Sequence, residues 1–168
     1  MLGQMTLAGI LGIAAAVVAA AAQEDALQRD TIATSGGDLV ITSVGHGSLV
    51  FEHGGKVVHV DPFGQLTDYG ALPKADLILV THHHGDHLDP EAIAKLRTER
   101  TELVLTAECA RTVEGGKVMA NGARLTVSGF DIEAVPAYNQ VHKRDNGEPF
   151  HPRGEGNGYV ISFGDKRV

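Results

Sequence analysis

The sequence predicts an α/β fold made mainly of short β-strands, and three observations predict it. Short apolar and β-branched segments recur along the chain and are separated by Gly-containing turns. The segment "ADLILVTH" at 75–82 is apolar over most of its length, which is typical of a strand buried on both faces of a sheet. An Asp-Pro pair at 89–90 follows it and can begin a helix, because proline suits the first helical position.

The remaining elements follow in order along the chain. A Gly-Gly pair at 54–55 makes a tight turn between two strands, and Ile93 and Leu96 mark the buried side of a helix. The expected strands lie at 38–45, 48–53, 56–62, 75–82, 101–107, 123–129 and 130–139. A helix is expected over 90–99, a shorter one over 107–113, a polar loop over 140–157 and a hairpin from 158 onward.

The N-terminal segment 1–22 differs from the rest of the chain. It carries no charged side chain and ends in small residues, after which the chain becomes polar. This order predicts a signal peptide over 1–22, cleaved near Ala22, and therefore a periplasmic or secreted protein. The alternatives are a cytosolic protein and a membrane anchor, although the alanine-rich run is short against the roughly 20 residues that a span needs. Residues 23–37 are polar with Gly and Ser, which predicts a linker.

The charge balance narrows the class of partner. The chain has 14 Lys and Arg against 21 Asp and Glu, a net charge of −7, so it offers no basic patch for the phosphates of a nucleic acid or an anionic membrane. We therefore expect a small-molecule substrate, no nucleic-acid partner and no stable membrane insertion after signal cleavage. Cys109 is the only cysteine, which excludes an internal disulfide and indicates a buried packing residue. The oligomeric state stays open.

The stretch "THHHGDHLDP" at 81–90 is the strongest functional signal. Residues i and i+2 of an extended chain point to the same side, so His82 and His84 can bind one ion through their imidazoles. The chain can turn at Gly85, so that Asp86 and His87 face a second ion. Imidazole with carboxylate suits Zn²⁺, or Mn²⁺ and Fe with more oxygen ligands. A solvated loop is the alternative, but the buried strand before it and the helix cap after it favour a metal site.

The motif His-x-His-x-Asp-His at 82–87 resembles the signature of the metallo-β-lactamase fold hydrolases. The flanking "VGHGSLVFEHGGKVVHVDP" and "ADLILVTH" are similar to the N-terminal half of the lactonase-like branch, and the resemblance runs from about Leu39 to the end of the chain. It implies an αβ/βα sandwich over 38–168 with two metal ions, Zn²⁺ by preference, at its edge. By this resemblance His82 and His84 serve the first metal and Asp86 and His87 the second. Asp86 is then also the catalytic residue that orients the hydroxide nucleophile.

The chain departs from the family pattern in two places. Members usually carry a third first-site histidine after the strand that matches 130–139, where this chain has Asn139. An amide oxygen binds Zn²⁺ more weakly than imidazole does, so His142 and His151 in the following loop are alternative ligands. The family also places a bridging aspartate and another histidine in the second half of the fold. Because the chain stops inside the second arm of a hairpin, we expect a domain truncated to roughly its N-terminal half or two-thirds.

Three residues outside the motif are candidates for supporting or substrate-binding roles. His46 matches a histidine that the lactonase-like branch carries near the active-site floor, and a structural histidine is the alternative. Asp61 ends a strand beside the metal strand, so it can accept a hydrogen bond from a ligand imidazole or simply form an Asp-Pro turn. Asn139 is the third candidate, because it lies at the position of an expected ligand.

These observations favour a metal-dependent hydrolase. A hydroxide held by the metals would attack an ester, lactone, phosphodiester or related bond. An exported non-catalytic metal-binding module is the alternative, favoured by Asn139 and disfavoured by the intact motif. Di-iron oxidoreductase chemistry is a third hypothesis, but no Cys-rich or flavin-binding segment accompanies it. Lactam hydrolysis ranks below ester or lactone cleavage.

Overall fold

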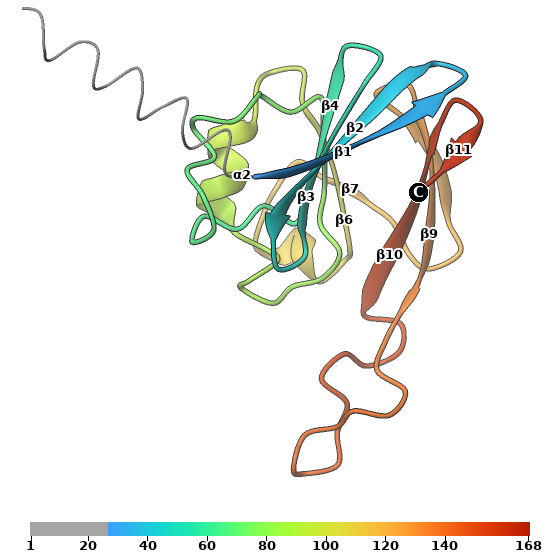
Figure 1. The fold of residues 1–168 in the computed structure, drawn as a ribbon. Coiled ribbons are helices and arrows are strands. Elements are labelled where there is room, and N and C mark those ends of the chain that lie inside the picture. The colour runs from blue at the N-terminus through green and yellow to red at the C-terminus, as the bar shows by residue number, and fades with distance from the viewer. Residues whose placement is uncertain (1–26) are drawn as a thin grey trace, which may run out of the picture.

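Two β-sheets and a helical layer build the fold (Figure 1). The computed structural model describes residues 27–168, so the predicted signal peptide at 1–22 lies outside the described residues. Within these residues, the larger sheet has the strand order β1-β2-β3-β4-β5-β6-β7 and the smaller sheet the order β11-β10-β9-β8. The larger sheet comprises β1 (Gln28–Thr34), β2 (Gly37–Gly45), β3 (Ser48–His53), β4 (Lys56–Val60), β5 (Leu77–Leu79), β6 (Glu102–Leu105) and β7 (Lys117–Val118). The smaller sheet comprises β8 (Arg124–Val127), β9 (Phe130–Ala137), β10 (Gly156–Phe163) and β11 (Lys166–Arg167).

Strands β1 to β4 form antiparallel hairpins, and the predicted strands at 38–45, 48–53 and 56–62 are confirmed as β2, β3 and β4. The turn between β3 and β4 lies at Gly54 and Gly55, whose φ angles are 59° and 75°. Two consecutive positive φ values are the geometry of a type I′ turn, which glycine adopts without steric cost and which matches the twist of the strands.

Strands β4 to β7 run parallel, so their carboxyl ends lie at one edge of the larger sheet. The central strand β5 is fully buried, as the sequence predicts. Leu77 and Leu79 pack in the core between the two sheets, and Ile78 packs in the core beneath the helices. The strand that leads into the histidine motif is therefore held from both faces.

Helix α2 (Pro90–Leu96) covers one face of the larger sheet together with a 3₁₀ helix at Cys109–Arg111. The Asp89 carboxylate accepts hydrogen bonds from the backbone N–H groups of Glu91 and Ala92, so the predicted helix start is confirmed. The helix ends at Leu96, earlier than the predicted residue 99, because Arg97 takes an extended ψ of 144°. Cys109 is fully buried beside this helix, as expected.

The prediction of a linker over 23–37 is wrong for Gln28–Thr34, which form strand β1 at the edge of the larger sheet. This strand pairs with β2 along its whole length, and Thr31 lies opposite Val40. Nearly all of its side chains are exposed, so it needs no apolar face and shows no apolar alternation in the sequence. Backbone pairing alone places it there, which a hydropathy pattern cannot reveal.

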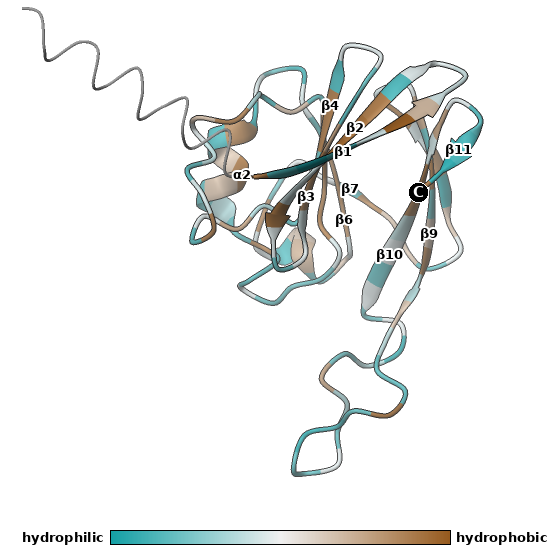
Figure 2. Cartoon of the chain, viewed as in Figure 1, coloured by the Kyte–Doolittle hydropathy of each residue, from teal (hydrophilic) through white to brown (hydrophobic). Residues whose placement is uncertain are grey.

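The smaller sheet packs on the other face of the larger one, and the predicted strands at 123–129 and 130–139 and the hairpin from 158 are confirmed. Phe51 of the larger sheet and Phe130 of the smaller one each approach the Phe163 ring, with centroid distances of 5.4 Å. Figure 2 shows the short edge strand β11 as hydrophilic and the helix α2 with both hydrophobic and hydrophilic residues. Strand β7 was not predicted, because it contributes two exposed residues.

The helices of the described part of the chain are short. None of those in residues 27–168 is long and apolar enough to cross a bilayer.

Candidate metal centre

The histidine motif lies directly after β5, at the edge where the parallel strands end. The backbone N–H of Val80 still bonds to the carbonyl of Val104, at 2.9 Å, so the sheet holds the chain up to the motif. The backbone N–H groups of His87 and Leu88 then both bond to the carbonyl of His84, at 2.9 and 2.8 Å, which closes a turn. A rigid strand end and a tight turn therefore fix the side chains of the motif.

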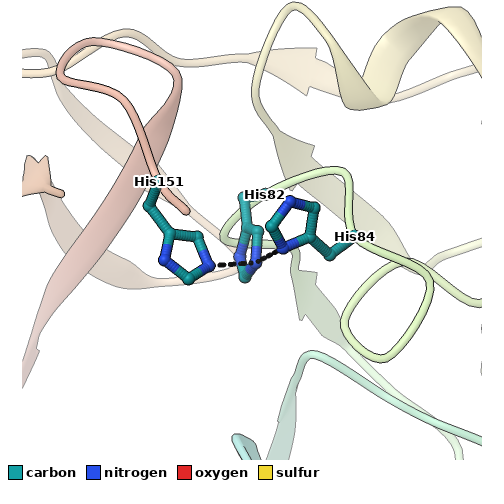
Figure 3. A group of neighbouring side chains, drawn as sticks. All are labelled: His82, His84 and His151. Carbon is teal, nitrogen blue, oxygen red and sulfur yellow. Dashed lines mark hydrogen bonds between the residues drawn. The ribbon is translucent and has the colours of Figure 1, made fainter. Parts of the chain in front are cut away.

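The first group consists of His82, His84 and His151, whose ligand atoms all lie within 4.8 Å of one another (Figure 3). The Nε2 atom of His82 is 3.2 Å from Nδ1 of His84 and 3.2 Å from Nε2 of His151. His82 and His84 lie in the segment that follows β5 of the larger sheet, whereas His151 comes from the loop between β9 and β10 of the smaller sheet. The structure thus brings together segments that are connected to different sheets.

His151, and not His142, is the loop histidine that approaches the motif. His142 is exposed and belongs to none of the three groups of possible ligands in the described chain. Asn139 lies beside His151 and binds it through its side chain. Its Oδ1 atom accepts hydrogen bonds from the backbone N–H of His151, at 2.7 Å, and from Nδ1 of the same ring, at 2.8 Å. The amide oxygen that was a possible ligand in the sequence is therefore occupied in holding His151.

The second group consists of His46, Asp86 and His87. His46 lies in the turn between β2 and β3, and its Nε2 atom is 2.8 Å from Oδ2 of Asp86. His87 is half-buried against the same turn, and its ring centroid is 5.1 Å from that of His46. The motif and a turn that is distant in sequence therefore meet here.

Asp61 is the buried acceptor that links the two groups. Its Oδ2 atom is 2.8 Å from Nδ1 of His87, and its Oδ1 atom accepts the backbone N–H of Thr81 at 2.7 Å. The hydroxyl of Thr81 donates to Asp61 at 2.6 Å and lies 2.9 Å from Nδ1 of His82. Thr81 was not a candidate in the sequence, because a lone threonine before a motif has no distinctive spacing.

These hydrogen bonds leave one nitrogen free on each of three rings. An Nδ1–H donates from His82 to Thr81, from His87 to Asp61 and from His151 to Asn139, so that Nε2 carries the lone pair in each case. Metal-ligating histidines in proteins almost always have this arrangement, in which the second nitrogen is fixed by a hydrogen-bond donation.

The pKa shifts agree with neutral rings at the first group. Burial, followed by the charges of His87 and His84, lowers the pKa of His82 to about 3. The pKa of His84 is also lowered, first by burial and then by His151. The hydrogen bond to Asp61 raises the pKa of His87. Because neutral imidazole is the form that binds metal ions, the donor set of this structure fits a metal ion.

The other histidines belong to none of these groups in the described chain. His83 is exposed, His53 contacts Thr34 through Nε2 at 3.0 Å, and His59 is a fully buried residue of β4. A cavity of about 440 Å³ opens beside the groups and is lined by His82, His151 and Tyr138 among others. Its size falls in the range of small-molecule sites.

The fold and this arrangement define a class of protein: an α/β sandwich whose parallel strands end in a cluster of imidazoles and carboxylates suited to metal ions. The family model described as "Beta-lactamase superfamily domain" matches residues 40–168. The chain therefore belongs to the metallo-β-lactamase superfamily, which confirms the resemblance seen in the sequence and the fold that it implied.

The chain is similar to several known proteins. It is 36% identical over 138 residues to a "UPF0173 metal-dependent hydrolase" of Flavobacterium johnsoniae, covering 76% of this chain and 59% of the relative. A crystal structure of a protein proposed to be a metal-dependent hydrolase, from Parabacteroides distasonis, is 42% identical with a TM-score of 0.78, covering 84% of this chain and 64% of that one. CmlA, a diiron β-hydroxylase from Streptomyces venezuelae, is 20% identical with a TM-score of 0.56 over 77% of this chain and 28% of its own, which shows a shared fold alone. The chain thus spans about three-fifths of the length of the relative it matches in Flavobacterium johnsoniae.

Proposed function

We propose that this chain carries the metal-binding part of a metal-dependent hydrolase that acts on a small-molecule substrate. The observation that carries the proposal is the convergence of His82, His84 and His151, whose ligand nitrogens all lie within 4.8 Å of one another. The relatives named metal-dependent hydrolases support the class of reaction, and the cavity beside the histidines supports a small substrate.

The proposed metal is Zn²⁺, because imidazole nitrogens dominate the donor set and Zn²⁺ accepts both imidazole and carboxylate. When bound at such a site, a metal ion polarises the bond under attack and lowers the pKa of a coordinated water to around 7. The residues of this chain provide the remaining functions. Asp86 would accept a hydrogen bond from the attacking water and so orient it. Asp61 keeps His87 in position through its contact with Nδ1.

The bond that is cleaved is proposed to be an ester, a lactone or a phosphodiester, since each presents an electrophilic centre to an activated water. Mn²⁺ and Fe are the alternative metals. CmlA, which shares the fold, is a diiron β-hydroxylase, so the metal analysis has to include iron.

The alternative of a non-catalytic metal-binding module was favoured by Asn139 at the position of an expected ligand. In the structure His151 occupies the space beside His82 and His84, and Asn139 holds His151. This geometry supports the hydrolase over the module.

The first experiment is metal analysis by mass spectrometry on the complete gene product, with His151→Ala and the matched control His142→Ala. We expect about two transition-metal ions in the wild type, a clear loss in His151→Ala and no loss in His142→Ala. The loaded protein is then assayed against lactones, carboxylic esters and phosphodiesters. Equal metal content in both variants would refute the assignment of His151, and bound metal without turnover in any class would favour the non-catalytic module.

We also propose that the protein is exported, because residues 1–22 have the order of a signal peptide. N-terminal sequencing of the protein from its native cells should begin near Gln23. An intact Met1 in the membrane fraction would support the anchor, and an intact Met1 in the cytosol would refute export.

A further inference from the structure

We infer that His46 is a ligand of the second metal position, together with Asp86 and His87. This inference rests on the proposed function, because it concerns the same metal centre. The family resemblance assigns only two residues of this chain to that position, both from the motif. The third side chain comes from the turn between β2 and β3, far away in the sequence (Figure 1).

The backbone of this turn is unusual at His46. Its φ angle is 51°, in the left-handed region, which is uncommon for residues other than glycine, although Asn, Asp and His adopt it more often than other side chains. Gly45 before it has a φ of 131°, and the pairing of β2 with β3 is irregular between Ser43 and Gly45. A turn that only joined two strands would be more stable with Gly or Asn at this position. Strain at a residue that points to a cluster of ligands indicates a functional role.

The same turn is fitted against His87. A Cβ atom added at Gly47 would lie 2.8 Å from Cε1 and 3.2 Å from Nδ1 of His87, so only glycine lets the backbone approach this ring. The turn therefore packs one of its residues under His87 and directs the neighbouring one, His46, to Asp86. Both contacts involve the two residues already expected to bind the second metal.

The three side chains offer two imidazoles and one carboxylate to the same ion. Nδ1 of His87 is engaged by Asp61, which leaves Nε2 available. Nε2 of His46 lies 2.8 Å from Oδ2 of Asp86, and the three ligand atoms lie within 4.8 Å of one another. Three protein ligands would leave a coordination position for water or substrate, as in catalytic zinc sites. About half of the His46 and Asp86 side chains is exposed, so an exposed ion pair by itself would contribute little to stability.

The test compares His46→Asn with the control His142→Asn in the complete gene product. Asparagine tolerates a positive φ, so the turn is retained. Its amide can still donate a hydrogen bond to Asp86, but it has no imidazole nitrogen to bind the metal. His142 is an exposed histidine outside the groups of possible ligands in the described chain. The measurements are metal content after dialysis, the dissociation constant of each Zn²⁺ equivalent by chelator competition, and the NMR signals of ligand imidazole N–H protons after Co²⁺ loading.

We expect His46→Asn to retain the first ion and to bind the second at least about 100-fold more weakly, because even residues that only hydrogen-bond to metal ligands contribute 10- to 100-fold to metal affinity. One imidazole N–H signal should also be lost. The control should match the wild type. If His46→Asn binds both ions as tightly as the wild type, His46 only forms a hydrogen bond and the inference is wrong. If the wild type binds a single ion, the inference is also wrong, but the proposed hydrolase function still stands. If the wild type binds no metal, both the inference and the proposed function are wrong.

Discussion

His59 makes the stability of the domain depend on pH through one buried ring. This side chain is completely buried, donates from Nε2 to the carbonyl of Pro73 at 3.0 Å, and has no partner at Nδ1. A second proton would therefore place an unpaired N–H and a charge in the core. Burial accordingly lowers the pKa of His59 from 6.5 to about 4, partly offset by the bond to Pro73.

The sign of the effect follows from proton uptake by the unfolded chain. Below pH 6.5 His59 takes up a proton in the unfolded state, whereas in the folded state it does so only near pH 4. The free energy of unfolding therefore falls as the pH decreases through this window. Each unit of pKa difference corresponds to about 1.4 kcal/mol, which gives a loss of about 2 kcal/mol by pH 5 and about 3 kcal/mol by pH 4.

The assay is urea unfolding, followed by circular dichroism from pH 7.5 to pH 4.5, of the wild type and His59→Gln. Glutamine keeps an N–H donor for Pro73 but does not titrate. Proton uptake by the metal ligands is common to both proteins and cancels in the difference between their stabilities. We expect His59→Gln to be less stable at pH 7.5 and to gain about 2 kcal/mol relative to the wild type by pH 5. A difference that stays constant over this range would refute the reasoning.

Two further substitutions test the supports of the metal centre. Gly47→Ala should weaken metal binding, because the new methyl would lie 2.8 Å from Cε1 of His87. Gly85→Ala is the matched control in the motif, since its Cβ would meet open space. Chelator competition measures the metal affinity of both variants, and equal affinities would contradict the close packing at Gly47. Asn139→Ala should lower metal affinity by about 10- to 100-fold, because the His151 ring loses its acceptor. Asn139→Asp, which keeps an acceptor oxygen, should recover much of it, and the contact would be irrelevant if all three proteins bound metal equally.

Features fixed by neighbouring residues were predictable from the sequence. Asp89 and Pro90 locate the start of α2, because both act within the first turn of the helix. His82 and His84 share one side of the chain because of their spacing alone. The buried strand β5 was recognisable because both of its faces need apolar side chains.

Features that depend on distant contacts were not predictable in the same way. The choice between His142 and His151 depends on how a long loop folds back onto the motif, and no local pattern encodes it. Asp61 accepts a hydrogen bond from His87, and this contact with a residue 26 positions away could not be distinguished in the sequence from a simple Asp-Pro turn. Strand β1 was not predicted, because an exposed edge strand is specified by backbone pairing and leaves no hydropathy pattern in the sequence.

The position of His151 has a thermodynamic consequence for the whole domain. His82 follows β5 of the larger sheet, and His151 lies 69 residues away in the loop between β9 and β10 of the smaller sheet, yet their Nε2 atoms lie 3.2 Å from each other. An ion bound by both residues would act as a reversible cross-link between the two sheets. It would close a long loop of the chain, as a disulfide bond does in other proteins. Folding and metal binding would then be linked equilibria. The free energy of unfolding would therefore increase with the concentration of free metal.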